Sequence, residues 1–194
     1  MDRPQIKLIK TRLDVILEST TFIILAFLWV YVIISYKSLP EIIPAHYGMD
    51  GTVDRYDKKI TVFLLPGILT IIVIGLRLLT RFAHKFNYLT PITKENAEKQ
   101  YKLSTRMLRV INFIIAMAFS YIAIKEIYDS KQSQAVMSWW FIPALFVALI
   151  GTTGYFIWKG YKKFWIMSYE FWVGLCLLWF FIVADTLNLL RYLY

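Results

Sequence analysis

The sequence is dominated by five apolar runs, each close to the length that crosses a lipid bilayer. An α-helix needs about 20 residues to span a hydrocarbon core of about 30 Å. The chain is 58% hydrophobic and 18% charged, whereas soluble domains are about 25% charged, so composition argues against a soluble fold. The five runs are Val15–Tyr36, Thr61–Leu79, Met107–Tyr128, Ser138–Trp158 and Tyr169–Leu190.

These runs predict an all-α integral membrane protein, built as a five-helix transmembrane bundle. Backbone groups in a bilayer are satisfied only in helices or closed barrels, and the alternating pattern of a barrel is absent. The first run exceeds the core of a signal peptide, so we expect it to remain as a helix. Residues 1–194 are then a single membrane domain, and the lipid bilayer is its first partner. Pro66 and Pro143 are expected to kink the second and fourth helices.

The distribution of Lys and Arg predicts the orientation of the chain. Of the 22 such residues, 15 lie within residues 3–12, 77–109 and 159–163, and the other seven lie within residues 37–59 and 125–131 and at residue 191. Because cytoplasmic loops are enriched in Lys and Arg, we expect a cytoplasmic N-terminus and an extracytoplasmic C-terminus in the cell inner (plasma) membrane. In a membrane protein, a net charge of +9 is explained by the attraction of Lys and Arg to the anionic cytoplasmic lipids. We therefore expect no nucleic acid as a partner.

The extracytoplasmic loop, residues 37–60, carries the side chains best suited to chemistry. Two prolines and two glycines in it favour an ordered, turn-rich loop over a helix. His46, Asp50 and Asp54 are the candidate metal ligands, although their spacing matches neither a zinc helix nor a calcium loop. In the alternative interpretation, Asp50 and Gly51 form a tight turn and the acidic residues stay solvated. In either case we expect the loop to fold onto the ends of the helices.

The segment of residues 80–106 is expected to form a basic cytoplasmic loop that continues into a helix. Thr93 is the expected N-cap, and in the run after it glutamates twice precede lysines by four residues, a spacing that supports helices. The third span therefore acquires a helical inner extension, which offers a surface for a cytoplasmic protein partner.

Positions in these two segments form a recognisable pattern. They are Leu39-Pro40, Ile43-Pro44, His46, Gly51, Asp54 and Lys59 in the outer loop, with Asn87-Tyr88, Ile92-Thr93, Glu95-Asn96-Ala97 and Gln100-Tyr101 in the inner segment. The pattern resembles the bacterial membrane-protein family that contains the domain of unknown function numbered sixteen forty-eight, related to the immunity-type protein SdpI. The resemblance implies that the outer positions bind a ligand and that Asn87, Glu95, Asn96, Gln100 and Tyr101 form an inner-loop motif.

Polar residues inside the spans are further candidates for a ligand site, since charged groups in lipid are costly unless paired or hydrated. Asp185 lies about 7–8 Å below the outer end of the last span by helical rise, with Asn188 on the same face. Glu126 ends the third span on that side. If these helices are neighbours, the three side chains face His46 and form one polar pocket. Alternatively, Asp185 pairs with a cation and only fixes the rotation of its helix.

The leading functional hypothesis is non-enzymatic recognition of an extracytoplasmic peptide or lipid, of the immunity or sensor type, through the loop of residues 37–60. The alternative is a membrane-embedded enzyme at the outer leaflet, with His46 as general base or metal ligand and Asp54 or Asp185 as its partner. A small transporter is a third option, but paired interrupted helices in two symmetric halves are missing. The sequence leaves open whether the chain is an enzyme and which cofactor, if any, it binds.

Overall fold

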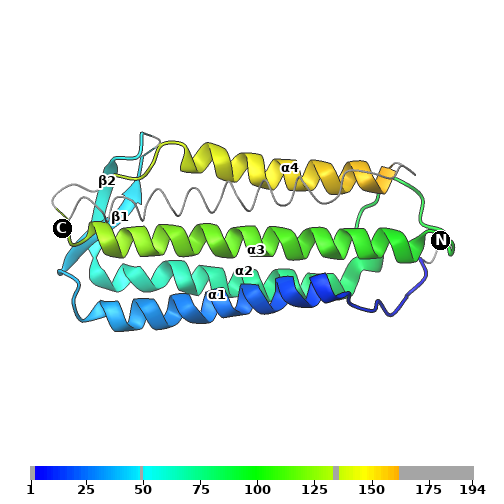
Figure 1. Ribbon diagram of the computed structural model, residues 1–194, viewed down its shortest axis with the longest axis horizontal. Helices are drawn as coiled ribbons and strands as arrows, with labels where there is room; N and C mark the ends of the chain where they lie inside the picture. Colours follow the sequence, from blue (N-terminus) through cyan, green and yellow to red (C-terminus); the bar gives the residue numbers. More distant parts are fainter. Residues whose placement is uncertain (1–2, 49, 133–135, 162–194) are drawn as a thin grey trace. The chain divides into compact units, whose positions relative to one another are not determined.

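Four helices in the part of the chain that the structure describes are long and apolar enough to cross a membrane (Figure 1). The structure is a computed structural model that describes residues 3–48, 50–132 and 136–161. The chain is therefore a mostly helical, multi-pass membrane protein, as predicted. The fifth predicted span, Tyr169–Leu190, lies outside the described residues, together with the candidate residues Asp185 and Asn188.

The described elements belong to one structural unit within residues 1–161. They are α1 (Arg12–Tyr36), β1 (Ile42–Tyr47), β2 (Val53–Lys58), the 3-10 segment η1 (Lys59–Phe63), α2 (Leu64–Leu79), the 3-10 segment η2 (Thr80–Lys85), α3 (Ala97–Asp129) and α4 (Phe141–Tyr161). The hairpin of β1 and β2 lies at one end of the helices, which we call the hairpin end (Figure 1). The opposite end, formed by residues 3–14, 77–109 and 156–161, is called the basic end.

Helix α3 is the central helix of this unit, because it packs against α1, α2 and α4. Its Ala116 and Ala123 are fully buried and share one core cluster with Leu28 of α1 and Val73 of α2. Small side chains allow helix backbones to approach closely in membranes, where packing is the main attraction between helices. Asn112 also donates from Nδ2 to the carbonyl of Val73 at 3.1 Å, which joins α3 to α2.

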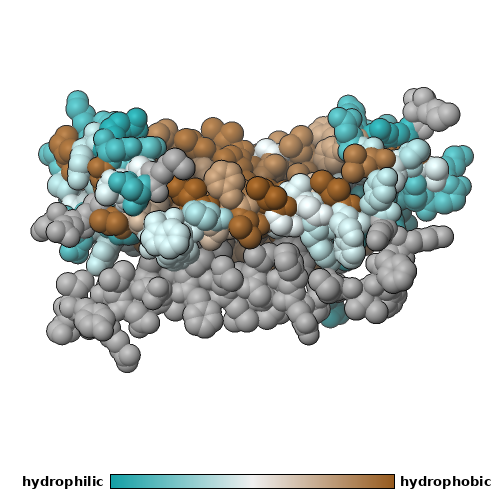
Figure 2. Space-filling view, turned by 90° about the horizontal axis from the view of Figure 1, so that it is seen from above, coloured by the Kyte–Doolittle hydropathy of each residue, from teal (hydrophilic) through white to brown (hydrophobic). Residues whose placement is uncertain are grey.

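The outer surface of the helices is apolar over its middle part. Figure 2 shows hydrophobic side chains between two hydrophilic ends on one face of the molecule. Phe27, Ile71, Phe146 and Ile150 of three different helices are each more than half exposed. Contiguous apolar surface of this kind is unfavourable in water and is covered by lipid in a membrane protein.

Helix α3 runs without a break from Ala97 to Asp129, as predicted for the third span and its extension, but it begins one turn later than expected. Thr93, the predicted N-cap, lies in a turn before the helix, and Asn96 occupies the N-cap position. The side chain of Asn96 accepts from the N–H of Thr93 and donates to the carbonyl of Pro91, both at 2.9 Å. These bonds favour a turn over a helix at residues 93–96, since Asn side chains compete for backbone groups.

The two prolines predicted to kink their helices both lie near the start of an α-helix. Pro66 is the third residue of α2 and Pro143 is the third residue of α4. The first four N–H groups of a helix have no partner within the helix, so Pro143 removes no hydrogen bond from α4 and the expected kink there was wrong. Pro66 lies next to the junction between the 3-10 segment η1 and α2, and a kink at that position stays a prediction.

Residues 42–58 form an antiparallel β-hairpin, where the sequence predicted a turn-rich loop. Ile43 of β1 is fully buried in the core cluster, whereas Ile42 is 55% exposed, so the alternation of a strand directs one face toward the helices. Pro44 made a strand unexpected, but each strand of a two-stranded sheet has an unpaired edge that tolerates proline. The segment thus folds onto the helices as a hairpin.

Candidate functional site

His46 and Asp54 are brought into direct contact by the hairpin. Nδ1 of His46 lies 2.6 Å from Oδ1 of Asp54, and the two side chains are 60% and 50% exposed. The strand register shifts on both sides of His46, and such irregularities re-aim side chains. A carboxylate at Nδ1 orients an imidazole and leaves Nε2 to accept a proton, bind a metal ion or hydrogen-bond a ligand.

The three candidate metal ligands do not form one cluster. The carboxylate of Asp50 accepts hydrogen bonds from the N–H and the hydroxyl of Thr52 at 3.0 and 2.8 Å, and these bonds hold the pKa of Asp50 below its usual range. Among the residues that the structure describes, no three His, Cys, Asp or Glu side chains gather as metal ligands. In the observed arrangement His46 could supply one ligand to an ion, through Nε2, while Asp54 orients the ring.

Two further candidates, Gly51 and Lys59, make contacts that hold the hairpin in place. Gly51 has a positive φ of 84°, and its carbonyl accepts from the N–H of Met137 at 2.7 Å, which ties the turn to the chain before α4. Nζ of Lys59 lies 2.8 Å from the carboxylate of Glu41, and its N–H donates to the carbonyl of Glu41 at 2.9 Å. This double contact closes the base of the hairpin.

A polar contact that joins the hairpin to α3 was missed by the sequence analysis. The hydroxyl of Tyr47 donates to Oδ2 of Asp129 at 2.8 Å, and Lys125 forms an ion pair with the same carboxylate. Burial, together with the charge of Asp129, raises the pKa of Tyr47 above its ordinary value. Had residues 42–47 been read as a strand, the period of two from Ile43 would have placed Tyr47 on the helix-facing side.

The candidate Glu126 lies on α3 three residues before Asp129 and is 5% exposed. The sequence placed it in one pocket with His46, Asp185 and Asn188. That pocket stays a prediction, because its last two residues lie outside the described part of the chain. The described part does concentrate two buried carboxylates, Glu126 and Asp129, at the hairpin end of α3.

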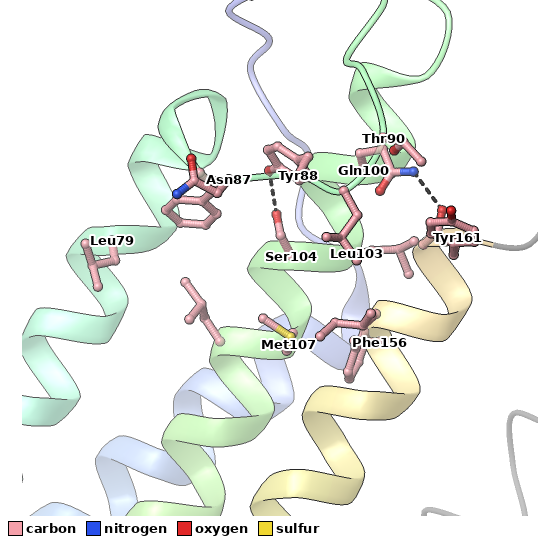
Figure 3. Close-up of a pocket in the computed structure, with 15 residues that line it drawn as sticks. Leu79, Asn87, Tyr88, Thr90, Gln100, Leu103, Ser104, Met107, Phe156 and Tyr161 are labelled. Carbon is pink, nitrogen blue, oxygen red and sulfur yellow. Dashed lines mark hydrogen bonds between the residues drawn. The ribbon is translucent and has the colours of Figure 1, made fainter.

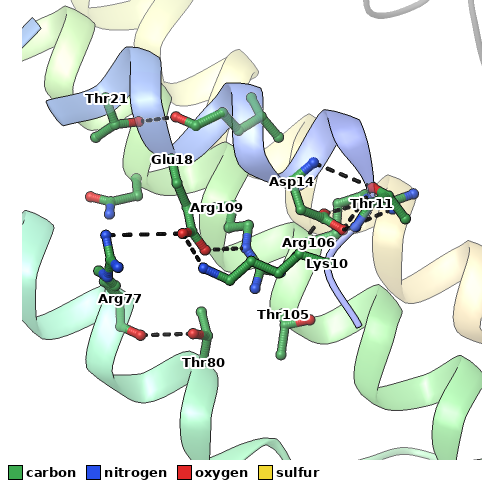
Figure 4. A network of polar contacts seen from close by, with 12 residues as sticks. Lys10, Thr11, Asp14, Glu18, Thr21, Arg77, Thr80, Thr105, Arg106 and Arg109 are labelled. Carbon is green, nitrogen blue, oxygen red and sulfur yellow. Dashed lines mark hydrogen bonds and ion pairs between the residues drawn. The ribbon is translucent and has the colours of Figure 1, made fainter. Parts of the chain in front are cut away.

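At the basic end, carboxylates of α1 and arginines of α3 form an ion network (Figure 4). Nε of Arg106 lies 3.0 Å from Oδ1 of Asp14, and Nε of Arg109 lies 2.7 Å from Oε1 of Glu18. Lys10 contacts the other oxygen of Glu18 at 2.5 Å. The side chains of Asp14, Glu18 and Arg109 are only 7%, 12% and 9% exposed. The network fixes the start of α1 against the part of α3 that lies at the basic end.

Of the predicted inner-loop motif, three positions shape the start of α3. Asn96 closes the turn described above. Glu95 is exposed, and a hydrogen bond from the Thr93 side chain lowers its pKa. Tyr101 is 1% exposed and its ring lies 5.7 Å from that of Tyr88, centroid to centroid. These contacts fold the segment before α3 back onto the helix.

The other two motif residues, Asn87 and Gln100, line a cavity of about 360 Å³ between residues 86–90, α3 and the end of α4 (Figure 3). Nε2 of Gln100 donates to the carbonyl of Gly160 at 2.9 Å, which joins α3 to α4 at the rim. The remaining lining is mostly apolar and includes Leu79, Leu103, Met107 and Phe156. The motif therefore does not converge on one site, since Glu95 and Asn96 lie in the turn.

Replacement of Gly51 by alanine should destabilise the hairpin. A Cβ at residue 51 would lie 2.0 Å from the carbonyl oxygen of Met137, and the positive φ alone costs a side chain about 1–2 kcal/mol. Gly51→Ala is expected to lower the midpoint of chemical unfolding in detergent micelles. Gly75→Ala is the matched control, because no atom lies within 4 Å of the added Cβ. Equal midpoints for the two variants would contradict this role of Gly51.

Removal of Arg109 should destabilise the protein far more than removal of an exposed cation on the same helix. Arg109→Met leaves Glu18 without its closest buried cation, and breaking buried pairs costs about 3 kcal/mol or more. Lys102→Met breaks the exposed pair with Glu98 and should cost less than about 1 kcal/mol. The free energies of unfolding in micelles compare the two variants. Similar losses in both would show that the network contributes little to stability.

Comparison with known proteins identifies a family for one segment of the chain. The chain is 27% identical over 133 residues to an uncharacterized protein from Archaeoglobus fulgidus, and the aligned region covers 69% of this chain and 61% of that relative. No solved structure matches the chain. Residues 23–70, which run from within α1 through the hairpin into α2, match the family model "Domain of unknown function (DUF1648)". This segment therefore matches the domain of unknown function that the sequence resembles.

Proposed function

We propose that this membrane protein is of the immunity or sensor type and recognises an extracytoplasmic peptide or lipid through the outer face of the β1–β2 hairpin. The observation that carries the proposal is an exposed polar surface on a fixed support. His46 and Asp54 are at least half exposed and paired at 2.6 Å, while the opposite face of the hairpin is buried against the helices through Ile43. A binding surface held in one conformation loses less entropy when its ligand binds.

Three contacts give the hairpin this support. The Tyr47–Asp129 hydrogen bond joins its first strand to α3, the Gly51–Met137 bond holds its turn, and the Lys59–Glu41 pair closes its base. Loops without such contacts are mobile and lose more entropy on binding. In this proposal His46 and Asp54 contact the ligand, whereas Gly51 and Lys59 hold the hairpin in place.

The proposed sensor output uses α3. This helix contacts the hairpin through Asp129 and α1 through Arg106 and Arg109, so one rigid element touches both ends. A ligand that shifted the hairpin would act on α3 first, and the turn and basic segment before α3 would present the change to a cytoplasmic protein partner. Glu126, which is buried on α3 near the hairpin, belongs to this proposal as a further candidate for the ligand site, as do Asp185 and Asn188, which lie outside the described residues.

A second candidate function is catalysis at the outer leaflet. The observation that favours it is the same 2.6 Å contact, since a histidine oriented by a carboxylate is the usual arrangement of a general base. The two functions differ in their response to Asp54→Asn. Loss of the orienting carboxylate lowers catalysis by orders of magnitude in a catalytic triad, whereas it removes only one contact from a recognition surface.

The proposal requires the hairpin end to be extracytoplasmic. Alkaline phosphatase is active only outside the cytoplasm, so fusions after Ser130 and Leu190 should be active and a fusion after Asn96 should be inactive. This expectation follows from the excess of Lys and Arg at the basic end. The reverse pattern of activity would place the hairpin in the cytoplasm and would refute recognition of an external ligand.

Recognition is tested with cells that express the chain and are exposed to a panel of secreted, membrane-active peptides. Expression should raise the lethal concentration of at least one peptide, and His46→Ala should lower that protection about tenfold, as expected when a binding contact worth more than 1 kcal/mol is removed. Lys131→Gln, which removes an exposed cation at the same end, should retain protection.

The amount of inserted protein is measured for each variant, so that loss of protection is not loss of expression. For lipids, binding of fluorescent phospholipids to the purified chain and to His46→Ala gives the equivalent comparison. If the chain confers no protection against any peptide and the two proteins bind lipids equally, recognition through the hairpin is wrong.

A further inference from the structure

A second cavity, of about 290 Å³, lies at the basic end and is lined by the N-terminal segment, η2 and α3; we call it the basic cavity. This volume is close to the lower limit of about 300 Å³ for small-molecule sites. Arg3 holds the N-terminal segment in place, since its guanidinium donates to the carbonyls of His84 and Phe86. The polar residues that line the cavity are Lys7, Lys10, Thr80, Arg81, His84, Tyr101 and Arg109, of which Lys10, Thr80 and Arg109 are labelled in Figure 4.

The charge of this cavity is not balanced by the protein. Four of its lining residues are Lys or Arg, and no Asp or Glu is among the residues that line it. Glu18, outside the cavity, pairs with Lys10 and Arg109. Lys7 and Arg81 form no ion pair within the part of the chain that the structure describes. Two cations of the cavity therefore lack a counter-charge, which an anionic ligand would supply.

A buried hydroxyl provides an independent indication of a ligand. Tyr101 lines the cavity and is 1% exposed, and its hydroxyl has no hydrogen-bond partner among the described residues. Buried polar atoms without partners are rare because they lose the hydrogen bonds that water supplies. A ligand oxygen in the cavity would accept a hydrogen bond from this hydroxyl.

We propose that this cavity binds a phosphate group, presented by a phospholipid headgroup or as free phosphate. Arg and Lys are the residues that bind phosphate oxygens, Arg through two parallel N–H groups and Lys as a point charge. The position supports this ligand: η2 ends the second candidate span, Lys59–Lys85, and the end of a span is where headgroup phosphates lie. Basic pockets between membrane helices bind anionic headgroups in this way.

The site does not depend on the function proposed for the hairpin, which lies at the other end of the helices. It does depend on the ion network, since Arg109 belongs to both. Glu18 holds Nε of Arg109 at 2.7 Å and so fixes the guanidinium at the cavity wall. Lys7 and Arg81 are exposed and unpaired in the described structure, so replacing them leaves the network intact.

The test measures binding to the full-length chain purified in a phosphate-free detergent. One arm adds inorganic phosphate, and the other adds phosphatidylglycerol or, as a phosphate-free lipid, a diglucosyl diacylglycerol. Bound molecules are counted by native mass spectrometry and affinities follow from titration. Phosphatidylglycerol is expected to bind in preference to the glycolipid. Binding of the lipid without free phosphate identifies a headgroup site, and binding of both identifies a site for the phosphate group itself.

The decisive variant is the double substitution Lys7→Gln and Arg81→Gln. It should weaken phosphate or phosphatidylglycerol binding by at least about tenfold, the effect of one charge-assisted hydrogen bond. The control is the double substitution Lys99→Gln and Lys131→Gln, which removes two exposed cations outside the cavity. The two double variants therefore have the same net charge. Equal affinities for the two double variants, or no binding by the wild-type chain in either arm, overturn the proposal.

Tyr101→Phe tests whether the anion enters the cavity. The variant removes only the unpartnered hydroxyl, so the melting temperature without ligand should be unchanged or higher, while affinity should fall about tenfold. Unchanged affinity would mean that the anion binds only to surface lysines, and it would overturn the proposal as well.

Discussion

The structure depends on the mutual neutralisation of charged groups where α1 meets α3. Removing an ion from water costs several kcal/mol even in real proteins, and an oppositely charged partner with good geometry offsets that cost. Asp14 and Glu18 are each contacted by arginines of α3, at 3.0 and 2.7 Å, so neither carboxylate is left alone. Because these four groups face one another at only one rotation and depth of the two helices, the network selects that arrangement. The apolar core between α1, α2 and α3, by itself, permits many more relative arrangements of the helices.

The same network organises the basic end beyond the two helices. Asp14 and Thr11 form a capping box at the start of α1, and Arg106 donates to the Thr11 hydroxyl at 2.9 Å. Lys10 reaches Glu18 at 2.5 Å. The segment before α1 is therefore tied to α3 and forms one wall of the basic cavity. The ion network that positions α1 against α3 thus also places Lys7 in the wall of this cavity together with Arg81, where neither cation has an ion-pair partner among the described residues.

The membrane spans could be predicted from the sequence because a bilayer imposes their length and apolar composition. A single residue such as Asn96 moves the start of a helix but does not change whether the helix can span the bilayer. The hairpin could not be predicted in this way. Its prolines and glycines are typical of a loop, and its pairing is stabilised by contacts with distant residues, Met137 and Asp129, that local patterns do not reveal. The contact of His46 with Asp54 depends on register shifts in the hairpin. The N-cap of α1 could have been predicted from the sequence, since Thr11 and Asp14 have the spacing of a capping box.

Helix α3 limits how the two ends of the protein can influence each other. It contains no glycine and no proline between Ala97 and Asp129, the residues at which helices usually bend, and it carries the Asp129 contact at one end and Arg106 and Arg109 at the other. A bend in the middle of α3 is therefore an improbable route for a signal. A displacement of the hairpin would instead translate or rotate the helix as a unit, by the small shifts that packed helices allow. Such a shift would strain the short Arg106–Asp14 and Arg109–Glu18 contacts, and the Arg109 guanidinium would move within the wall of the basic cavity. Coupling between the ends thus requires two discrete arrangements of this ion network.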